Sequence, residues 1–215
     1  MLKFEEEARL KGYRFIIGVD EAGRGPLAGP VVSAAVMLKS TAFQNKIDDS
    51  KKMSDKQRER AFMEIFENGY VGLGIMSESV IDTANILQAT FFSMANAVRQ
   101  LVQGLPQEVS RLEAFNQQVL LLIDGPHFKS DLPYANRPII DGDAQSLSIA
   151  CASIVAKVYR DRILKTYDAI YPEYGFKAHK GYPTRAHRLA IQNIGLSPIH
   201  RRSFQVKTVT GGINE

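Results

Sequence analysis

The feature that most constrains the fold of this 215-residue chain is an apolar run over 119–123 that ends at Asp124. An uninterrupted run of this length is typical of a β-strand that is covered on both faces, as in α/β proteins. A second short apolar strand is expected over 15–19, and it ends at Asp20 and Glu21. The sequence therefore predicts a buried sheet with carboxylates at the ends of two strands.

The remaining sequence alternates strand patterns with amphipathic helices, which predicts the α/β class. A loop rich in glycine and proline over 23–30 is long enough to join the first strand to an antiparallel partner over 31–38. Residues 54–57 and 79–82 fit capping boxes, each of which opens a helix. The other expected elements are a strand over 71–75, a buried helical stripe from Ile86 to Leu101, a β-like pair at Ile139–Ile140, a helix over 145–167 and a short helix capped by Thr184.

Length and composition predict one domain over 1–215, with a core over about 13–204 and a loose tail over 205–215. Hydrophobic residues make up 45% of the chain and charged residues 23%, which are ordinary values for a globular protein. Cys151 is the only cysteine, so an internal disulfide is excluded, and we expect this thiol in the core. No apolar run approaches the roughly 18 residues of a membrane-spanning helix. We therefore expect a cytoplasmic protein with no membrane partner.

Acidic residues follow three predicted strands: Asp20 with Glu21, then Asp124, then the pair Asp141 and Asp143. Ligands of α/β sheets gather at such strand ends. Converging carboxylates repel one another unless a cation neutralises them, and oxygen ligands without cysteine favour Mg²⁺ or Mn²⁺. Two such ions could activate water for phosphodiester hydrolysis. The alternative interpretation is turn chemistry, since Asp before Gly is common in turns, and spacing alone does not separate a nuclease from a phosphatase.

The segment 20–26 joins an acid pair directly to a glycine-rich loop. Its glycines let the backbone approach a ligand closely, and Arg24 adds a candidate phosphate contact. The loop lacks the Gly-Lys-Ser/Thr ending of a P-loop and the spacing of a dinucleotide fingerprint. Both of these nucleotide-binding classes are therefore disfavoured.

The stretch 18–31 resembles the opening motif of ribonuclease HII, the prokaryotic type 2 ribonuclease H family. Six further segments are similar to motifs of that family, and all seven follow the family's order within residues 13–204. These segments are 49–52, 122–125, 152–161, 174–176, 179–184 and 200–204. The resemblance implies an RNase H-like fold, with a mixed central sheet flanked by helices and a helical C-terminal part.

The resemblance also implies an activity and a set of catalytic residues. The family is metal-dependent and cuts the RNA strand of RNA–DNA hybrids, and it nicks DNA on the 5′ side of single embedded ribonucleotides, leaving a 3′-hydroxyl and a 5′-phosphate. The family carboxylates fall on Asp20, Glu21, Asp124 and Asp143. They would hold two Mn²⁺ or Mg²⁺ ions: Asp20 would touch both ions, Glu21 and Asp124 one each, and Asp143 would complete the second site.

The resemblance implies which residues bind the substrate as well. The backbone of Gly23, Arg24 and Gly25 would read the ribose 2′-hydroxyl, which separates RNA from DNA. Tyr182 would pack on the deoxyribose after the junction; its alternative role is a loop aromatic that covers the core. The candidates for phosphate contacts are Lys51, Lys52, Lys180 and Arg185.

The sequence departs from the family pattern at two places. Before the fourth acid, Asp141 stands where a lysine is expected, and Ala144 replaces a serine. The register of Ser153 and Lys157 favours Asp143 over Asp141 as the ligand. The stretch 101–118 is longer than the usual family connection, and we interpret it as a surface insertion.

The charge distribution is compatible with a nucleic-acid partner. Residues 151–215 hold 11 Lys or Arg and 4 Asp or Glu, an excess of seven positive charges. Such an excess favours a surface for a polyanion, the alternative being a solvated basic face. A monomer is the family expectation. His127 is expected on a loop surface and His179 in a structural role.

Two other functions stay open at this point. The first is another two-metal phosphodiesterase, such as a DNA resolvase, which needs no loop that reads a 2′-hydroxyl. The second is a catalytically inactive module that binds nucleic acid. Cleavage of all-DNA substrates discriminates the first, and absence of metal-dependent turnover discriminates the second.

Overall fold

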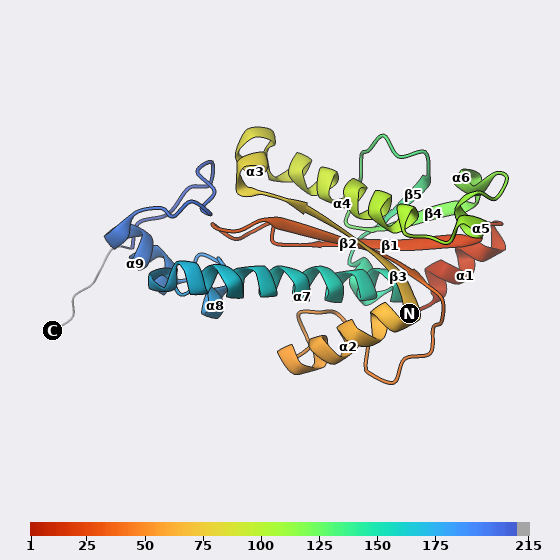
Figure 1. Ribbon diagram of the computed structural model, residues 1–215, viewed down its shortest axis with the longest axis horizontal. Helices are drawn as coiled ribbons and strands as arrows, with labels where there is room; N and C mark the ends of the chain where they lie inside the picture. Colours follow the sequence, from red (N-terminus) through yellow and green to blue (C-terminus); the bar gives the residue numbers. More distant parts are fainter. Residues whose placement is uncertain (210–215) are drawn as a thin grey trace.

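The computed structural model describes residues 1–209 and contains a five-stranded mixed sheet in the order β3-β2-β1-β4-β5 (Figure 1). The central strand β1 pairs antiparallel with β2 and parallel with β4, and β5 is parallel to β4. The strands are β1 (Phe15–Ala22), β2 (Val31–Leu38), β3 (Gly69–Met76), β4 (Val119–Asp124) and β5 (Ala135–Ile139). The predicted mixed sheet and the antiparallel pairing across the 23–30 loop are confirmed.

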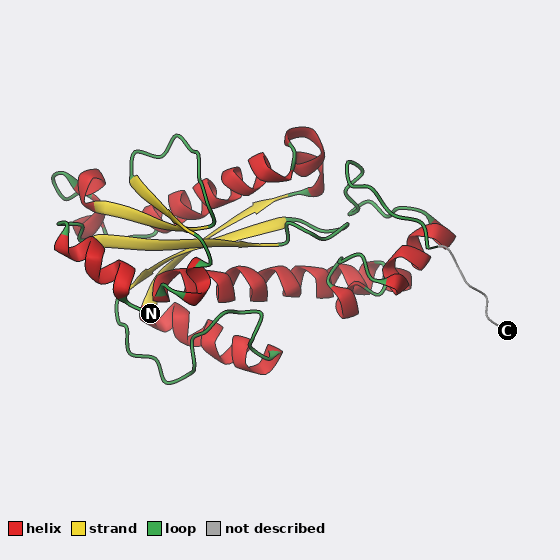
Figure 2. Cartoon of the chain, turned by 180° about the vertical axis from the view of Figure 1, so that it is seen from behind, coloured by secondary structure: helices red, strands yellow, loops and turns green. Residues whose placement is uncertain are grey.

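Helices cover both faces of the sheet, as Figures 1 and 2 show. On one face α4 (Ile86–Gln103) packs on β3 and β2. On the other face α7 (Leu147–Ile170) lies against β1 and β2, and α2 (Asp55–Asn68) packs on α7 and β3. Helix α7 approaches β1 so closely that a Cβ at Gly18 would lie 2.2 Å from the Ser148 carbonyl carbon. This contact fixes α7, which carries several pocket residues, directly against the strand that carries Asp20.

Shorter helices complete the fold. They are α1 (Lys3–Leu10), α3 (Glu78–Ala84), α5 (Gln107–Ser110), α6 (Phe115–Gln118), α8 (Phe176–His179), α9 (Arg185–Ile194) and the 3₁₀ turns Gly142–Ala144 and Pro172–Tyr174. Helices α8 and α9 lie at the end of α7 farthest from α1 and form the predicted helical C-terminal part (Figure 1). An isolated antiparallel bridge between Ala28 and His200 ties this part to the glycine loop. In the described residues, no helix is long and apolar enough to cross a membrane.

The N-terminal helix belongs to the packed structure, although the sequence placed the core only from about residue 13. Ala8 is buried in an apolar cluster with Ile16. The Glu5 carboxylate is buried and accepts hydrogen bonds from the Ser146 and Ser148 hydroxyls at 2.6 and 2.8 Å. It therefore lies at the N-terminus of α7, where a negative charge is favourable.

Several predicted boundaries shift. The capping box at Ser54 is confirmed, but the box expected over 79–82 is wrong. Helix α3 begins after Ser77, and Asn85, with a φ of 70°, separates it from α4. The Asp82 carboxylate instead accepts the backbone N–H groups of residues 202 and 203 at 2.9 Å, because a distant segment competes for it.

Other elements differ in extent only. Strand β5 begins before the predicted Ile139–Ile140 pair, and Ile140 itself is exposed. Thr184 caps α9 as predicted, and Cys151 is buried in the core. Residues 107–114 lie mostly at the surface, whereas Leu105 and Phe115 are buried in the α4 core cluster, so both ends of the expected insertion are anchored. The predicted loose tail falls from residue 210 onward outside the described residues.

Candidate active site

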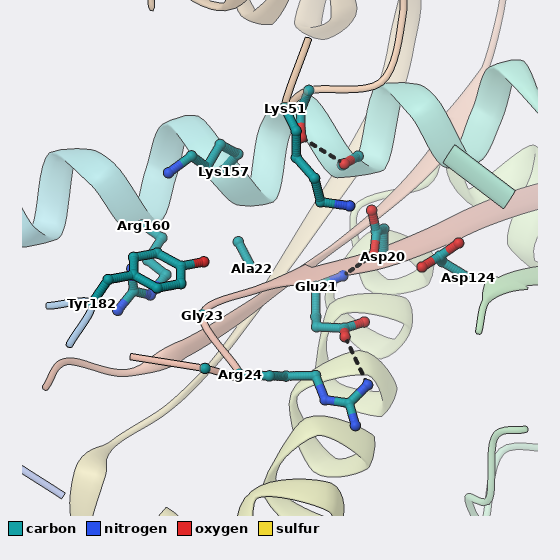
Figure 3. Close-up of a pocket in the computed structure, with 13 residues that line it drawn as sticks. Asp20, Glu21, Ala22, Gly23, Arg24, Lys51, Asp124, Lys157, Arg160 and Tyr182 are labelled. Atoms are coloured by element: carbon teal, nitrogen blue, oxygen red, sulfur yellow. Dashed lines mark hydrogen bonds and ion pairs between the residues drawn. The ribbon is translucent and has the colours of Figure 1, made fainter. Parts of the chain in front are cut away.

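The sheet places the predicted acids next to each other. Strands β1 and β4 are parallel, and Val19 lies beside Ile123. The next residues along the two strands, Asp20 and Asp124, therefore occupy neighbouring positions at the same edge of the sheet. Asp20 is only 4% exposed, and Glu21 comes next on β1 (Figure 3). The sequence pattern of a buried strand followed by an acid therefore leads directly to this arrangement.

A hydrogen bond between the 3₁₀ turn Gly142–Ala144 and the end of β4 positions the fourth acid. Asp124 Oδ1 accepts the backbone N–H of Gly142 at 2.7 Å, which fixes the 3₁₀ turn that carries Asp143. The Asp143 side chain is buried, and its Oδ2 lies 3.3 Å from Lys51 Nζ. Asp141, by contrast, is exposed at the start of the turn. The structure therefore places Asp143, and not Asp141, beside the other acids.

Burial and neighbouring charges raise the pKa values of Asp20, Glu21 and Asp124. Burial raises the pKa of Asp20 well above its usual range, and the charges of Glu21 and Asp124 raise it further. Burial is also the main cause that raises the pKa of Glu21, opposed by the Arg24 guanidinium 3.3 Å away. The pKa of Asp124 is raised by burial and by Asp143, while the Gly142 N–H lowers it. A charged cluster of this kind is costly unless a cation neutralises it.

The chemistry of the donor set fits a hard divalent cation, because every candidate ligand is a carboxylate oxygen. Within residues 1–209, no group of three or more His, Cys, Asp or Glu side chains is close enough to hold a metal ion. The acids nevertheless lie close enough for the charges of Glu21 and Asp124 to act on Asp20 and for that of Asp143 to act on Asp124.

An open pocket of about 240 Å³ connects Asp20, Glu21 and Asp124 with the glycine loop. The ring of Tyr182 stands beside the loop, 3.6 Å from where a Cβ at Gly25 would lie (Figure 3). This ring is 43% exposed, so it does not cover the core. The lining residues are Asp20, Glu21, Ala22, Gly23, Arg24, Gly25, Ser50, Lys51, Asp124, Ser153, Lys157, Arg160 and Tyr182.

Comparison with known proteins identifies the family. A family model described as Ribonuclease HII matches residues 17–207. The ribonuclease HII of Ruminiclostridium cellulolyticum is 48% identical over 95% of this chain and 75% of its own length. The chain belongs to the ribonuclease HII family. It is therefore an endoribonuclease of the ribonuclease H type, a hydrolase that acts on nucleic acid.

Solved structures of ribonucleases HII and HIII share the fold. The Archaeoglobus fulgidus ribonuclease HII, solved in complex with PCNA, aligns with a TM-score of 0.71 at 19% identity, over 92% of this chain and 98% of its own. A Bst ribonuclease HIII in complex with Mn²⁺ aligns with a TM-score of 0.59 at 18% identity, over 87% and 65% of the two chains. The RNase H-like fold expected from the sequence is thereby confirmed.

Of the four lysines and arginines outside the glycine loop that are predicted to contact phosphate in this ribonuclease HII family member, one lines the pocket. Lys51 does so next to Asp143. Lys52 instead pairs with Asp49 at 3.6 Å, and Arg185 is exposed at the first position of α9. Lys180 faces a second groove outside the pocket.

Sequence reasoning used Ser153 and Lys157 only to set the register of the motif, but both line the pocket. Ser153 Oγ lies 2.9 Å from Ser50 Oγ, and Lys157 Nζ lies 2.7 Å from Asp161 Oδ1. Their spacing of four residues, which puts both on one face of a helix, was the available signal. His127 is exposed, as predicted, and His179 has a structural role, since its Nε2 lies 2.8 Å from the Tyr174 carbonyl oxygen.

Proposed function

We propose that this enzyme nicks duplex DNA on the 5′ side of a single embedded ribonucleotide and cuts the RNA strand of RNA–DNA hybrids, leaving 3′-hydroxyl and 5′-phosphate ends. The observation that carries the proposal is that Asp20, Glu21 and Asp124 line one open pocket together with the glycine loop, while Asp143 pairs with Lys51 of the same pocket. A phosphodiester held at the acids has its neighbouring ribose within reach of Gly23, Arg24 and Gly25. Hydrolysis and recognition of RNA are thus combined in one site.

Asp20, Glu21, Asp124 and Asp143 would hold Mn²⁺ or Mg²⁺ in a two-metal site, with Asp20 serving both ions. Bound there, the ions supply activation of water and stabilisation of the leaving oxygen. The complex of Bst ribonuclease HIII with Mn²⁺ supports this choice of cation. Neutralisation by a cation also keeps the buried Asp20 carboxyl ionised, since burial and its acidic neighbours otherwise raise its pKa.

Side chains of the chain itself would position the substrate around these acids. The Lys51 ammonium, next to Asp143, can contact a phosphate oxygen, and Arg24 next to Glu21 can do the same. The exposed Tyr182 ring would pack on the deoxyribose that follows the ribonucleotide. Lys52, Lys180 and Arg185 would contact phosphates farther along the duplex.

The glycine loop distinguishes this proposal from the resolvase alternative. A resolvase acts on DNA and needs no group that recognises a 2′-hydroxyl, whereas the loop lies directly beside the acids. We also propose that the enzyme acts as a monomer, because a single chain supplies the acids, the glycine loop and Tyr182 to the pocket.

A panel of labelled duplexes tests the proposal. The panel contains one DNA duplex with a single ribonucleotide, the same duplex made of DNA only, and an RNA–DNA hybrid, each with Mg²⁺, Mn²⁺ or chelator. We expect metal-dependent cleavage of the first and third substrates and none of the second. Cleavage of the all-DNA duplex would favour a resolvase, and loss of all cleavage in folded protein would favour an inactive binding module.

A further inference from the structure

Two arginine side chains lie almost completely buried behind the glycine loop. Arg160 and Arg201 are each 1% exposed. Within residues 1–209, neither forms an ion pair with a carboxylate. Burial lowers the pKa of Arg160 to about 10 and that of Arg201 to about 9, so both stay protonated at neutral pH. A buried charge is costly unless it is hydrogen-bonded, so its partners show what it does.

All hydrogen bonds of the Arg201 guanidinium go to backbone carbonyls of the glycine loop. It donates at 2.6 Å to the carbonyl of Gly23, at 3.0 Å to that of Arg24 and at 2.8 Å to that of Pro26. Two more hydrogen bonds, of 2.9 and 2.7 Å, reach the carbonyl of Gly29. The five donors of one planar group thus hold four carbonyls of the loop in fixed directions.

Arg160 holds the remainder of the loop. It donates to the carbonyls of Ala28 and Pro30, each at 3.0 Å. A third hydrogen bond of 2.9 Å goes to the carbonyl of Lys180, two residues before Tyr182. The same side chain therefore ties the glycine loop to the segment that carries the pocket tyrosine.

The direction of these carbonyls determines where the loop amides point. In a trans peptide, the N–H of one residue is opposite to the C=O of the residue before it. Because the carbonyls of Gly23 and Arg24 are turned toward Arg201, the N–H groups of Arg24 and Gly25 are turned away from it. Both residues line the pocket, and neither N–H donates to an acceptor within the described part of the chain.

We propose that Arg201, assisted by Arg160, is a positioning residue for ribose recognition. It holds the loop carbonyls behind the pocket and thereby presents the N–H groups of Arg24 and Gly25 to the 2′-oxygen of the ribonucleotide. A deoxyribose offers no oxygen there, so both amides stay without a partner, which disfavours DNA. This inference rests on the proposed function, because it assumes that a ribose occupies the pocket.

The variant Arg201→Lys tests the role. It keeps the positive charge but offers three donors without the planar fork, so it cannot hold the same four carbonyls. Affinities for the duplex with one ribonucleotide and for the matched all-DNA duplex are measured in chelator, which prevents cleavage. We expect the Kd for the all-DNA duplex divided by the Kd for the ribonucleotide duplex to fall by about tenfold, equivalent to about 1.4 kcal/mol. The all-DNA Kd should stay nearly constant.

Tyr174→Phe is the matched control. It removes a 3.0 Å hydrogen bond to the Gly195 carbonyl in the same C-terminal part without touching the loop. A destabilised protein loses active molecules equally for both duplexes, so in this control the ratio should not change. An unchanged ratio in folded Arg201→Lys would overturn the positioning role.

Hydrogen exchange on the unmodified enzyme keeps the inference testable if Arg201→Lys does not fold. We expect the ribonucleotide duplex to protect the amides of Arg24 and Gly25 more strongly than the all-DNA duplex does. Equal protection by two duplexes that the enzyme otherwise distinguishes would contradict the inference. If the enzyme does not distinguish the duplexes at all, the proposed function itself fails.

Discussion

The backbone N–H of Gly142 donates a hydrogen bond to Asp124 Oδ1 at 2.7 Å, and this contact connects the end of β4 with the turn that carries Asp143. One oxygen of the Asp124 carboxylate therefore holds the Asp143 turn against the end of β4. Its carboxylate has both a structural and an electrostatic role, because it also raises the pKa of Asp20. The two roles can be separated by an isosteric substitution.

We predict that Asp124→Asn folds normally but loses cleavage by at least about a hundredfold. The asparagine oxygen can still accept the Gly142 N–H, so the turn is kept, whereas the charge that would bind a cation is lost. The measurement is the initial cleavage rate of a duplex with one ribonucleotide. Asp141→Asn is the matched control: Asp141 is exposed at a φ of 52°, which asparagine tolerates, so cleavage should be nearly unchanged. Near-normal cleavage by Asp124→Asn would remove this residue from the catalytic set.

Asp20→Asn should make the metal-free protein more stable. Folding raises the pKa of this carboxyl, so its protonated form is favoured in the folded state, and stability falls as pH rises from the ordinary value of 3.8 through the raised pKa. At neutral pH, a neutral amide avoids this loss. Each 1 kcal/mol gained corresponds to an increase of about 2–4 °C in Tm for a chain of this size.

The measurement is thermal unfolding in chelator and in Mn²⁺. Mn²⁺ should raise the Tm of the unmodified protein, because a ligand that binds only the folded state stabilises it. In Asp20→Asn the same addition should have little effect, and cleavage should be lost. A lower Tm of the variant in chelator would show that the Asp20 charge is not the destabilising feature.

The C-terminal part should lose stability in mild acid. His187 and His200 are buried with their Nε2 atoms 3.0 Å apart, and burial lowers the pKa of each to about 4. Between the ordinary value of 6.5 and about 4, the unfolded chain binds protons that the folded chain does not. Stability is therefore fully present above pH 6.5 and falls as pH decreases toward 4, by at most about 1.4 kcal/mol per histidine for each pH step of about one.

Urea unfolding at about pH 7 and about pH 5, on either side of the ordinary histidine pKa, measures this loss. The exposed His127 serves as the reference, and His127→Gln should leave the difference between the two conditions unchanged. His187→Gln should reduce the difference. The acids of the site have raised pKa values and act in the opposite direction over this range, but they contribute equally to both proteins. A difference that His187→Gln leaves unchanged would therefore argue against two neutral buried histidines.

Tyr182→Ala should reduce cleavage at an RNA-to-DNA junction by roughly tenfold, which is the scale of a lost stacking contact. A continuous hybrid has no deoxyribose at that position of the cut strand, so its cleavage should fall less. Initial rates on the two substrates measure the difference. An equal loss on both substrates would leave the ring without a role at the junction.

The central part of the site could be predicted because its information is local in the sequence. An apolar strand followed directly by an acid, at Asp20 and again at Asp124, identifies both the strand and its functional end. The parallel pairing of β1 with β4 was not predicted, and it is this pairing that brings the two acids to the same edge of the sheet. Asp143 needed the family resemblance, since Asp141 fits the same local pattern.

The rest depends on contacts between distant segments. The sequence predicts a capping box in which Ser79 pairs with Asp82. In the structure the Asp82 carboxylate instead accepts a hydrogen bond from a residue more than a hundred positions away, so this capping box does not form. Arg160 and Arg201 count toward the basic surface predicted from charge, yet both are buried against backbone carbonyls. No local pattern marks a charged residue as buried, because its partners are carbonyls that every residue carries.

Mapping the cut at single-nucleotide resolution tests the central claim most directly. A duplex with one ribonucleotide is labelled at either end of the modified strand and incubated with Mn²⁺, and the fragment ends are identified. We predict one cut on the 5′ side of the ribonucleotide, with a 3′-hydroxyl and a 5′-phosphate, and no cut in the matched all-DNA strand. A cut on the 3′ side, or cuts independent of the ribonucleotide, would contradict a pocket in which the acids and the glycine loop act on one nucleotide.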